Sequence, residues 1–257
     1  MRNIRRLLAI LLTAPVLALA AGEDVHLDRA PIDEHDLVSL QRGAKVFVNY
    51  CLGCHSASYM RYNRLEALGL SAQQIRDNLI LTGAKVGDLM KNAMDPADAK
   101  QWFGAPPPDL TVIARSRSSS AGSGADWLYT YLRGFYRDAS RPTGWNNVVF
   151  RDVGMPHILW HLQGEQELRS EVITIPRGGD EEDALKHEVQ KLVLVQPGQL
   201  SAVEYDRLVA DLVNFLVYMA EPQKRTRIEV GIYVLLFLGL FFVLAYLLKK
   251  EYWKDVH

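Results

Sequence analysis

The sequence predicts a mainly α domain that one C-terminal transmembrane helix holds to a membrane. Three observations support this prediction: apolar residues recur at helical spacing, two segments open on a helix-capping pattern, and a long run near the C-terminus carries no charge. The chain has 257 residues and no internal repeat, so a single domain over residues 22–224 is expected between the two terminal segments.

The N-terminus predicts an export signal. Residues 1–21 combine three early arginines, an apolar stretch and the small-residue pattern Ala18-Leu19-Ala20. The apolar stretch is short for a hydrocarbon core of about 30 Å, and Pro15 interrupts it. We therefore expect a signal peptide cleaved after Ala20 or Ala21, rather than a membrane anchor.

Three segments of the domain carry helix signals. Apolar residues at 37, 40, 44 and 47 predict an amphipathic helix over residues 36–47, which leads directly into a pair of cysteines. Ser71 with Gln74, and Ser201 with Glu204, resemble capping boxes and predict helices near 72–80 and 202–219. Pro222 should end the last helix. Segments 104–109 and 116–124 predict a stiff turn and a flexible loop.

The C-terminal run predicts a membrane anchor over residues 228–248. Residues 230–248 carry no charge and lack the polar face of a soluble helix. Lysine and arginine flank the run almost evenly, so the charges alone do not orient it. The export signal does: we expect the domain outside the cytoplasm and the tail 249–257 inside it.

Charge excludes one class of partner and marks one segment. The formal net charge is −1, and loss of the three signal arginines leaves about −4 on the mature chain, so nucleic acid is not an expected partner. Segment 165–188 holds eight acidic residues against three basic ones. The plain interpretation is a solvated surface insertion.

The cysteines predict a haem site. Cys51-Leu52-Gly53-Cys54-His55 is the C-x-x-C-H pattern, in which two thiols bond the porphyrin edge and the histidine binds the iron. A thioredoxin-like pair and half of a zinc site are the alternatives. A second Cys/His pair at zinc spacing and a βαβ pattern are both missing from the sequence, and export supplies the compartment of c-type haem.

The sixth iron ligand decides what such a haem does, because an open position favours gas binding or peroxide chemistry and a methionine raises the reduction potential. Met90, Met94 and Met155 are the candidate methionines, and His157 and His161 are possible imidazole rivals. Met155 lies between Gly154, which permits a close backbone approach to the ring, and Pro156, which stiffens the loop.

Several separated motifs resemble the cytochrome c1 family in order and spacing over essentially the whole length. They are Cys51-Leu52-Gly53-Cys54-His55-Ser56, Ala105-Pro106-Pro107-Pro108-Asp109-Leu110, Ala114-Arg115-Ser116-Arg117, Gly154-Met155-Pro156, and Ala220-Glu221-Pro222 before the C-terminal run. The resemblance implies a cytochrome c-like haem domain with loop insertions.

The resemblance also implies site roles. One haem c would be bound covalently by Cys51 and Cys54, with His55 and Met155 as iron ligands. The stretch containing Pro108 would line the haem edge. Arg117 would pair with a haem propionate, although the serine-rich loop around it departs from the family's glycine-rich pattern.

By the same resemblance, the chain would be the redox subunit of the quinol:cytochrome c oxidoreductase (bc1) complex, with no catalysis of its own. It would pass electrons from the Rieske iron–sulfur protein to a cytochrome c, beside cytochrome b, in a dimeric complex of a bacterial inner membrane with the haem domain in the periplasm. The acidic segment would then attract a basic cytochrome c.

Two alternatives remain from the residues. A membrane cytochrome of a terminal oxidase or nitric oxide reductase would share the C-x-x-C-H pattern, but it commonly has an N-terminal anchor. A haem enzyme or gas sensor would leave the iron five-coordinate and would bind carbon monoxide at once when reduced.

Overall fold

The computed structural model describes residues 26–177 and 180–255, with the backbone alone for 172–177, 180–188 and 225. The predicted signal peptide, residues 1–21, lies outside the described residues. In chain order the elements are α2 (Leu37–Val46), η1 (Phe47–Cys51), β1 (Ala57–Arg61), η2 (Tyr62–Leu68), α3 (Ala72–Asn78), β2 (Leu89–Met90), α4 (Pro96–Phe103), α5 (Ile113–Ser116), α6 (Gly124–Arg133), β3 (Phe135–Arg137), β4 (Trp145–Asn147), α7 (Trp160–Gln163), β5 (Gly164–Arg177), β6 (Asp180–Pro197), α8 (Ala202–Ala220) and α9 (Lys224–Tyr252).

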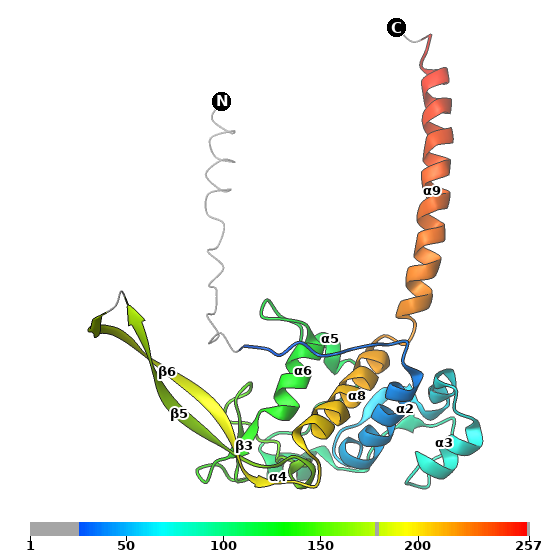
Figure 1. Cartoon of the computed structure of the whole chain (residues 1–257). Helices are drawn as coiled ribbons and strands as arrows, with labels where there is room; N and C mark the ends of the chain where they lie inside the picture. The colour runs from blue at the N-terminus through cyan, green and yellow to red at the C-terminus, as the bar shows by residue number, and fades with distance from the viewer. Residues whose placement is uncertain (1–25, 178–179, 256–257) are drawn as a thin grey trace, which may run out of the picture.

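The mainly α prediction is confirmed. Helices α2, α6 and α8 form the body of the domain, and α9 leaves it as a separate long helix (Figure 1). The strands of the described residues form three two-stranded antiparallel sheets, β1–β2, β3–β4 and β5–β6. Small sheets of this kind connect helices and do not form a core of their own.

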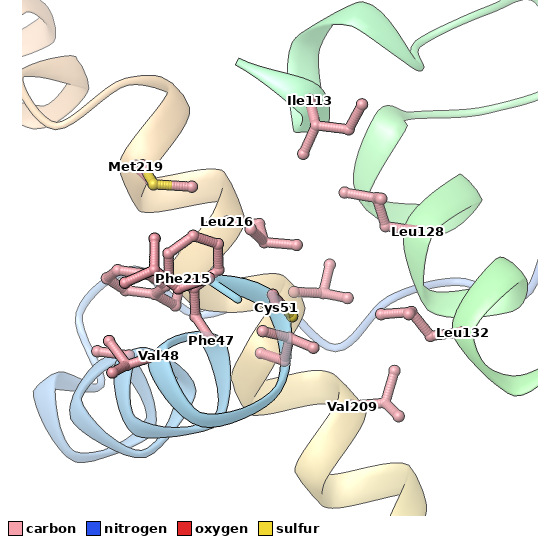
Figure 2. Packing of buried hydrophobic residues seen from close by; sticks show 14 of the residues in the cluster. Phe47, Val48, Cys51, Ile113, Leu128, Leu132, Val209, Phe215, Leu216 and Met219 are labelled. Atoms are coloured by element: carbon pink, nitrogen blue, oxygen red, sulfur yellow. The ribbon is translucent and has the colours of Figure 1, made fainter. Parts of the chain in front are cut away.

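The core lies where α2 packs on α8, and α5 and α6 close it from the other side (Figure 2). Gly43 makes the first contact possible, because a Cβ there would overlap the Asp211 carbonyl. The rings of Phe47 and Phe215 pack at 5.7 Å between centroids. Arg42 then binds the Asp211 carboxylate through two hydrogen bonds, of 2.6 and 2.9 Å. This packing fixes the end of α2, from which the cysteine motif follows.

The helices expected from the sequence all form. Asp36 caps α2 by accepting a hydrogen bond from the Ser39 amide, and the helix continues as the π-helical turn η1 to Cys51. Ser71 caps α3 and Ser201 caps α8 by complete capping boxes with Gln74 and Glu204. The expected loop 116–124 is shorter, because α5 ends at Ser116 and α6 begins at Gly124.

An unexpected feature is the β5–β6 hairpin, which carries the acidic segment 165–188. Its strands pair from Gly164 with Pro197 to Arg177 with Asp180, and the hairpin projects away from the helices (Figure 1). Its base is fixed to the domain, since the Gln166 side chain donates hydrogen bonds of 3.0 Å to the carbonyls of Arg133 and Phe135. The acidic segment is therefore an arm, and the side chains of its residues 172–188 are not described.

Helix α9 exceeds the expected span of residues 228–248 at both ends. It runs for 29 residues, about 43 Å at 1.5 Å per residue, which suffices for a hydrocarbon core of about 30 Å with residues to spare in the headgroup regions. Within residues 226–252, a window of 18 residues reaches a mean hydropathy of 2.6, and this helix is the single candidate span among the described residues. Helix α9 is thus long and apolar enough to cross a membrane, in keeping with the anchor expected from the sequence.

Candidate haem-binding site

A cavity of about 320 Å³ lies between α6, α8 and the cysteine motif. Leu128 and Leu132 of α6 form one wall, and Leu212 and Leu216 of α8 form another. The remaining lining consists of Cys51, Cys54, His55, Phe103, Ala105, Pro106, Pro107, Pro108, Leu110, Ile113, Arg117, Trp127, Tyr131, Phe150, Val153, Gly154, Met155, Pro156 and Ile158. All six site residues predicted from the sequence thus line one largely apolar cavity, a common form of cofactor site.

The cysteine motif forms one wall through a single tight turn. The amides of Cys54 and His55 both donate to the Cys51 carbonyl, at 3.0 and 2.8 Å, which turns all three side chains toward the cavity. Burial, together with the neighbouring Cys54, raises the pKa of the Cys51 thiol to about 12. A redox-active dithiol needs a thiolate at neutral pH, so this environment disfavours the thioredoxin-like alternative.

His55 is held in the form that a metal ligand requires. Its side chain is buried, and Nδ1 lies 2.8 Å from the Pro108 carbonyl oxygen. A carbonyl can only accept, so Nδ1 carries the proton and Nε2 keeps its lone pair. Burial lowers the pKa of His55, against the opposing effects of the Pro108 hydrogen bond and the Asp109 charge. The imidazole is therefore neutral, and Pro108 orients it in addition to lining the cavity.

Of the three candidate methionines, Met155 alone lines the cavity. Met90 is fully buried on β2, where it packs in the core. Met94 is half-buried in the segment that precedes α4. The fold therefore brings the sulfur of Met155 into the same cavity as the imidazole of His55.

The two histidine rivals are outside the cavity lining. The His157 ring stacks on Phe135, with centroids 4.7 Å apart and planes inclined by 4°, and burial lowers its pKa to about 4. His161 packs against Tyr50 at 5.6 Å between ring centroids. Both imidazoles have packing roles in this fold.

The segment before Met155 is held in an unusual conformation. Asp152 has a φ of 59°, in the left-handed region that aspartate tolerates better than most side chains. Arg141 binds both the carboxylate and the carbonyl of Asp152, at 2.9 and 2.8 Å. A Cβ on Gly154 would lie 2.7 Å from the Phe103 carbonyl oxygen. The absence of a side chain at Gly154 thus lets the Phe103 carbonyl come close, a contact that the sequence did not reveal.

Arg117 lies at the cavity edge, between two aromatic rings. Its guanidinium carbon is 4.6 Å from the centroid of the Trp127 ring and 5.7 Å from that of Phe150. Within the described part of the chain, no carboxylate forms an ion pair with this side chain. Stacking fixes the guanidinium without neutralising it, so it can bind an anionic group.

Sequence reasoning missed Tyr131. Its hydroxyl lies 3.4 Å from the Met155 sulfur, and its ring stacks on Trp127 at 4.7 Å. Burial raises the pKa of Tyr131. The i, i+4 spacing of Trp127 and Tyr131 on α6 was the available signal, but it reads equally well as core packing.

The cavity fits a covalently attached haem. It offers two thiols for attachment, one imidazole nitrogen and one thioether for the iron, apolar walls for the ring and a guanidinium for an acidic edge. Over the described residues, no group of three or more His, Cys, Asp or Glu side chains could hold a metal ion directly.

Known proteins match the chain over its full length. The model of the Cytochrome C1 family matches residues 28–161 and 195–256. A protein of Nitrosomonas europaea named ammonia monooxygenase gamma subunit is 52% identical over 257 residues, 100% of both chains. Cytochrome c1 of Allochromatium vinosum is 52% identical over 252 residues, 98% of both chains, and that of Rhodospirillum rubrum is 28% identical over 249 residues, 86% of this chain and 83% of the relative. The unmatched residues 162–194 include most of the hairpin.

Proposed function

Because the chain belongs to the cytochrome c1 family, we propose that His55 and Met155 are the axial ligands of one haem c, which Cys51 and Cys54 bind through thioether bonds. As a member of this family, the chain is the haem-bearing electron-transfer subunit of the bc1 complex, and it carries covalently bound haem c. It is a redox subunit and not an enzyme by itself.

One observation carries the ligand assignment: His55, both cysteines and Met155 line the same cavity. Because His55 and Met155 lie far apart along the chain, only the tertiary fold can bring them into one cavity. Met90, Met94, His157 and His161 contribute nothing to the lining.

The residues of the chain set the conditions for electron transfer. When bound, the haem iron gains and loses one electron, and a methionine ligand raises its reduction potential relative to a second imidazole. The Pro108 carbonyl fixes the His55 ring, while the leucines of α6 and α8 give the cavity apolar walls. Arg117 would bind a haem propionate and hold that edge of the ring.

Membership of the bc1 complex implies cytochrome b and the Rieske protein as partners. We propose that the Rieske protein supplies the electron, that a cytochrome c accepts it, and that the complex is dimeric. The resemblance of the motifs to the family supports the proposed electron donor, the proposed acceptor and the dimeric state.

For the membrane topology, we propose that the haem domain lies in the periplasm of a bacterial cell and that the C-terminus lies in the cytoplasm. The N-terminal export pattern and the single C-terminal helix support this orientation. A cysteine introduced at Ser140, in an exposed turn, should react with an impermeant thiol reagent in intact spheroplasts. A cysteine introduced at Asp255 should react only after lysis, and the reverse pattern would contradict the orientation.

The hairpin is the proposed docking arm for a basic cytochrome c. Its segment 165–188 has eight acidic and three basic residues, and complementary charge accelerates encounter in a way that salt screens. Replacing Glu181 and Glu182 with glutamine should flatten the salt dependence of cytochrome c reduction. The matched control neutralises Glu66 and Asp77, exposed acids outside the hairpin. Equal slopes in the hairpin variant and the control would refute the docking role.

The test of the whole assignment is purification of the tagged full-length chain from membranes in mild detergent. Quinol:cytochrome c reductase activity should co-purify with b-type haem and an iron–sulfur protein. Because the relative named ammonia monooxygenase gamma subunit is as similar as cytochrome c1 of Allochromatium vinosum, ammonia oxidation is assayed in the same fraction. Ammonia oxidation without reductase activity would overturn the assignment, and so would co-purification with oxidase subunits alone.

A further inference from the structure

We propose that Tyr131 is a positioning residue for Met155, whose sulfur accepts a hydrogen bond from the tyrosine hydroxyl and thereby sets the reduction potential of the site. The distance from Oη to Sδ is 3.4 Å, which is hydrogen-bonding range for sulfur. The inference rests on the proposed function, because it concerns the sulfur that is assigned there to the iron.

Tyr131 is rigidly placed for this task. Its ring lies between Trp127, stacked at 4.7 Å with planes 13° apart, and Phe135, at 5.1 Å in an edge contact. Its backbone carbonyl accepts a 2.8 Å hydrogen bond from the buried side chain of Asn147 on β4. The ring and the backbone are both fixed, so the hydroxyl has little freedom to turn from the sulfur.

The chemistry of a thioether gives the sign of the effect. Sulfur has two lone pairs, so it can bind iron through one and accept a hydrogen bond through the other. The hydrogen bond draws electron density from the sulfur and makes it a poorer donor. Ferric iron depends more on ligand donation than ferrous iron does, so the contact favours the reduced state and raises the potential.

Tyr131→Phe removes the hydroxyl and keeps the ring. Redox titration of the haem-loaded full-length protein should give a lower potential, and a tenfold weaker preference for the ferrous state would appear as a fall of about 59 mV. The matched control is Tyr129→Phe, since Tyr129 is a buried tyrosine of the same helix that is outside the cavity lining. Its potential should equal that of the unmodified protein.

A second substitution tests the sign without loss of volume. A ring-fluorinated tyrosine at position 131 has a more acidic hydroxyl, which donates more strongly, so the potential should rise. This measurement decides the matter even if Tyr131→Phe fails to incorporate haem. An unchanged potential in the Phe variant, or a fall with the fluorinated residue, would overturn the inference.

A further variant separates this inference from the assignment on which it rests. Met155→Leu should abolish the spectroscopic signature of methionine ligation to ferric haem and should let the reduced protein bind carbon monoxide. If it does so while Tyr131→Phe leaves the potential unchanged, the role of Tyr131 is refuted and the ligand assignment stands. If Met155→Leu leaves the spectrum unchanged, both are refuted.

Discussion

Replacing Gly154 with alanine should loosen the bond that we propose between Met155 and the haem iron. The new Cβ would lie 2.7 Å from the Phe103 carbonyl oxygen, whereas ordinary contact begins at 3.4 Å. The loop must therefore shift by roughly 0.7 Å, the difference between the two distances, at a cost of about 1 to 3 kcal/mol in stability. A functional constellation tolerates displacements of only about 0.5 Å, so the sulfur should no longer hold the iron permanently.

Carbon monoxide reports this change directly, because it binds reduced haem only where the sixth position is open. The reduced full-length protein should refuse carbon monoxide, and the Gly154→Ala variant should bind it and show a lowered reduction potential. Gly83→Ala is the control, since a Cβ at Gly83 would have nothing within 4 Å. A variant at Gly154 that refuses carbon monoxide and keeps its potential would refute the claim that the Phe103 contact positions Met155.

Two further predictions concern the stability of the domain. Burial would raise the pKa of Asp109, but hydrogen bonds from Thr111 and Ser58 outweigh it and lower that pKa. The ionised carboxylate therefore adds stability above its unfolded pKa of about 3.9, and this stability is lost as pH falls through the lower folded value. Asp109→Asn should thus make Tm fall less steeply as the solution is acidified. A fall of Tm as steep as in the unmodified protein would contradict this. The Tyr205 hydroxyl donates a 2.9 Å hydrogen bond to the buried Leu132 carbonyl, and Tyr205→Phe should lower the free energy of unfolding by about 1 to 2 kcal/mol in denaturant titration, whereas the exposed Tyr59→Phe should change nothing.

The helices were predictable because their signals are local. A capping box needs only a serine and a Gln or Glu three residues later, and Ser71 and Ser201 both form one. The hairpin left only half of a signal, since a β-branched run, residues 172–175, precedes the Gly178-Gly179 pair and none follows it directly. Four acidic residues follow that pair directly, and a projecting two-stranded ribbon buries little apolar surface, so its alternation of apolar and polar residues is weak. The segment therefore resembled a solvated loop.

The part of the site whose functional residues are close together in the sequence could be predicted. Cys51, Cys54 and His55 lie within one turn, so spacing alone placed them together. Met155 is distant along the chain, and the residues alone could not separate it from Met90 or Met94. The contacts that hold its loop, such as Arg141 on Asp152, join side chains whose individual types carry no functional signal.

The base of the hairpin arm lies close to the haem site, and its geometry explains how the arm is inserted into the family fold. Gly164 and Pro197 pair where the strands meet the domain, so the segments on either side of the insertion remain adjacent. Gly164 has a φ of 99°, and a Cβ there would crowd the backbone of Gly198, so glycine fits this junction where other side chains are strained. Just beyond the junction, Gln166 binds the Phe135 carbonyl, and the Phe135 ring stacks on His157, next to the segment of Met155. The contacts at the base of the arm thus lie next to the cavity, and the outer part of the arm lies beyond them, so we expect substitutions in the outer part to leave His55 and Met155 in place.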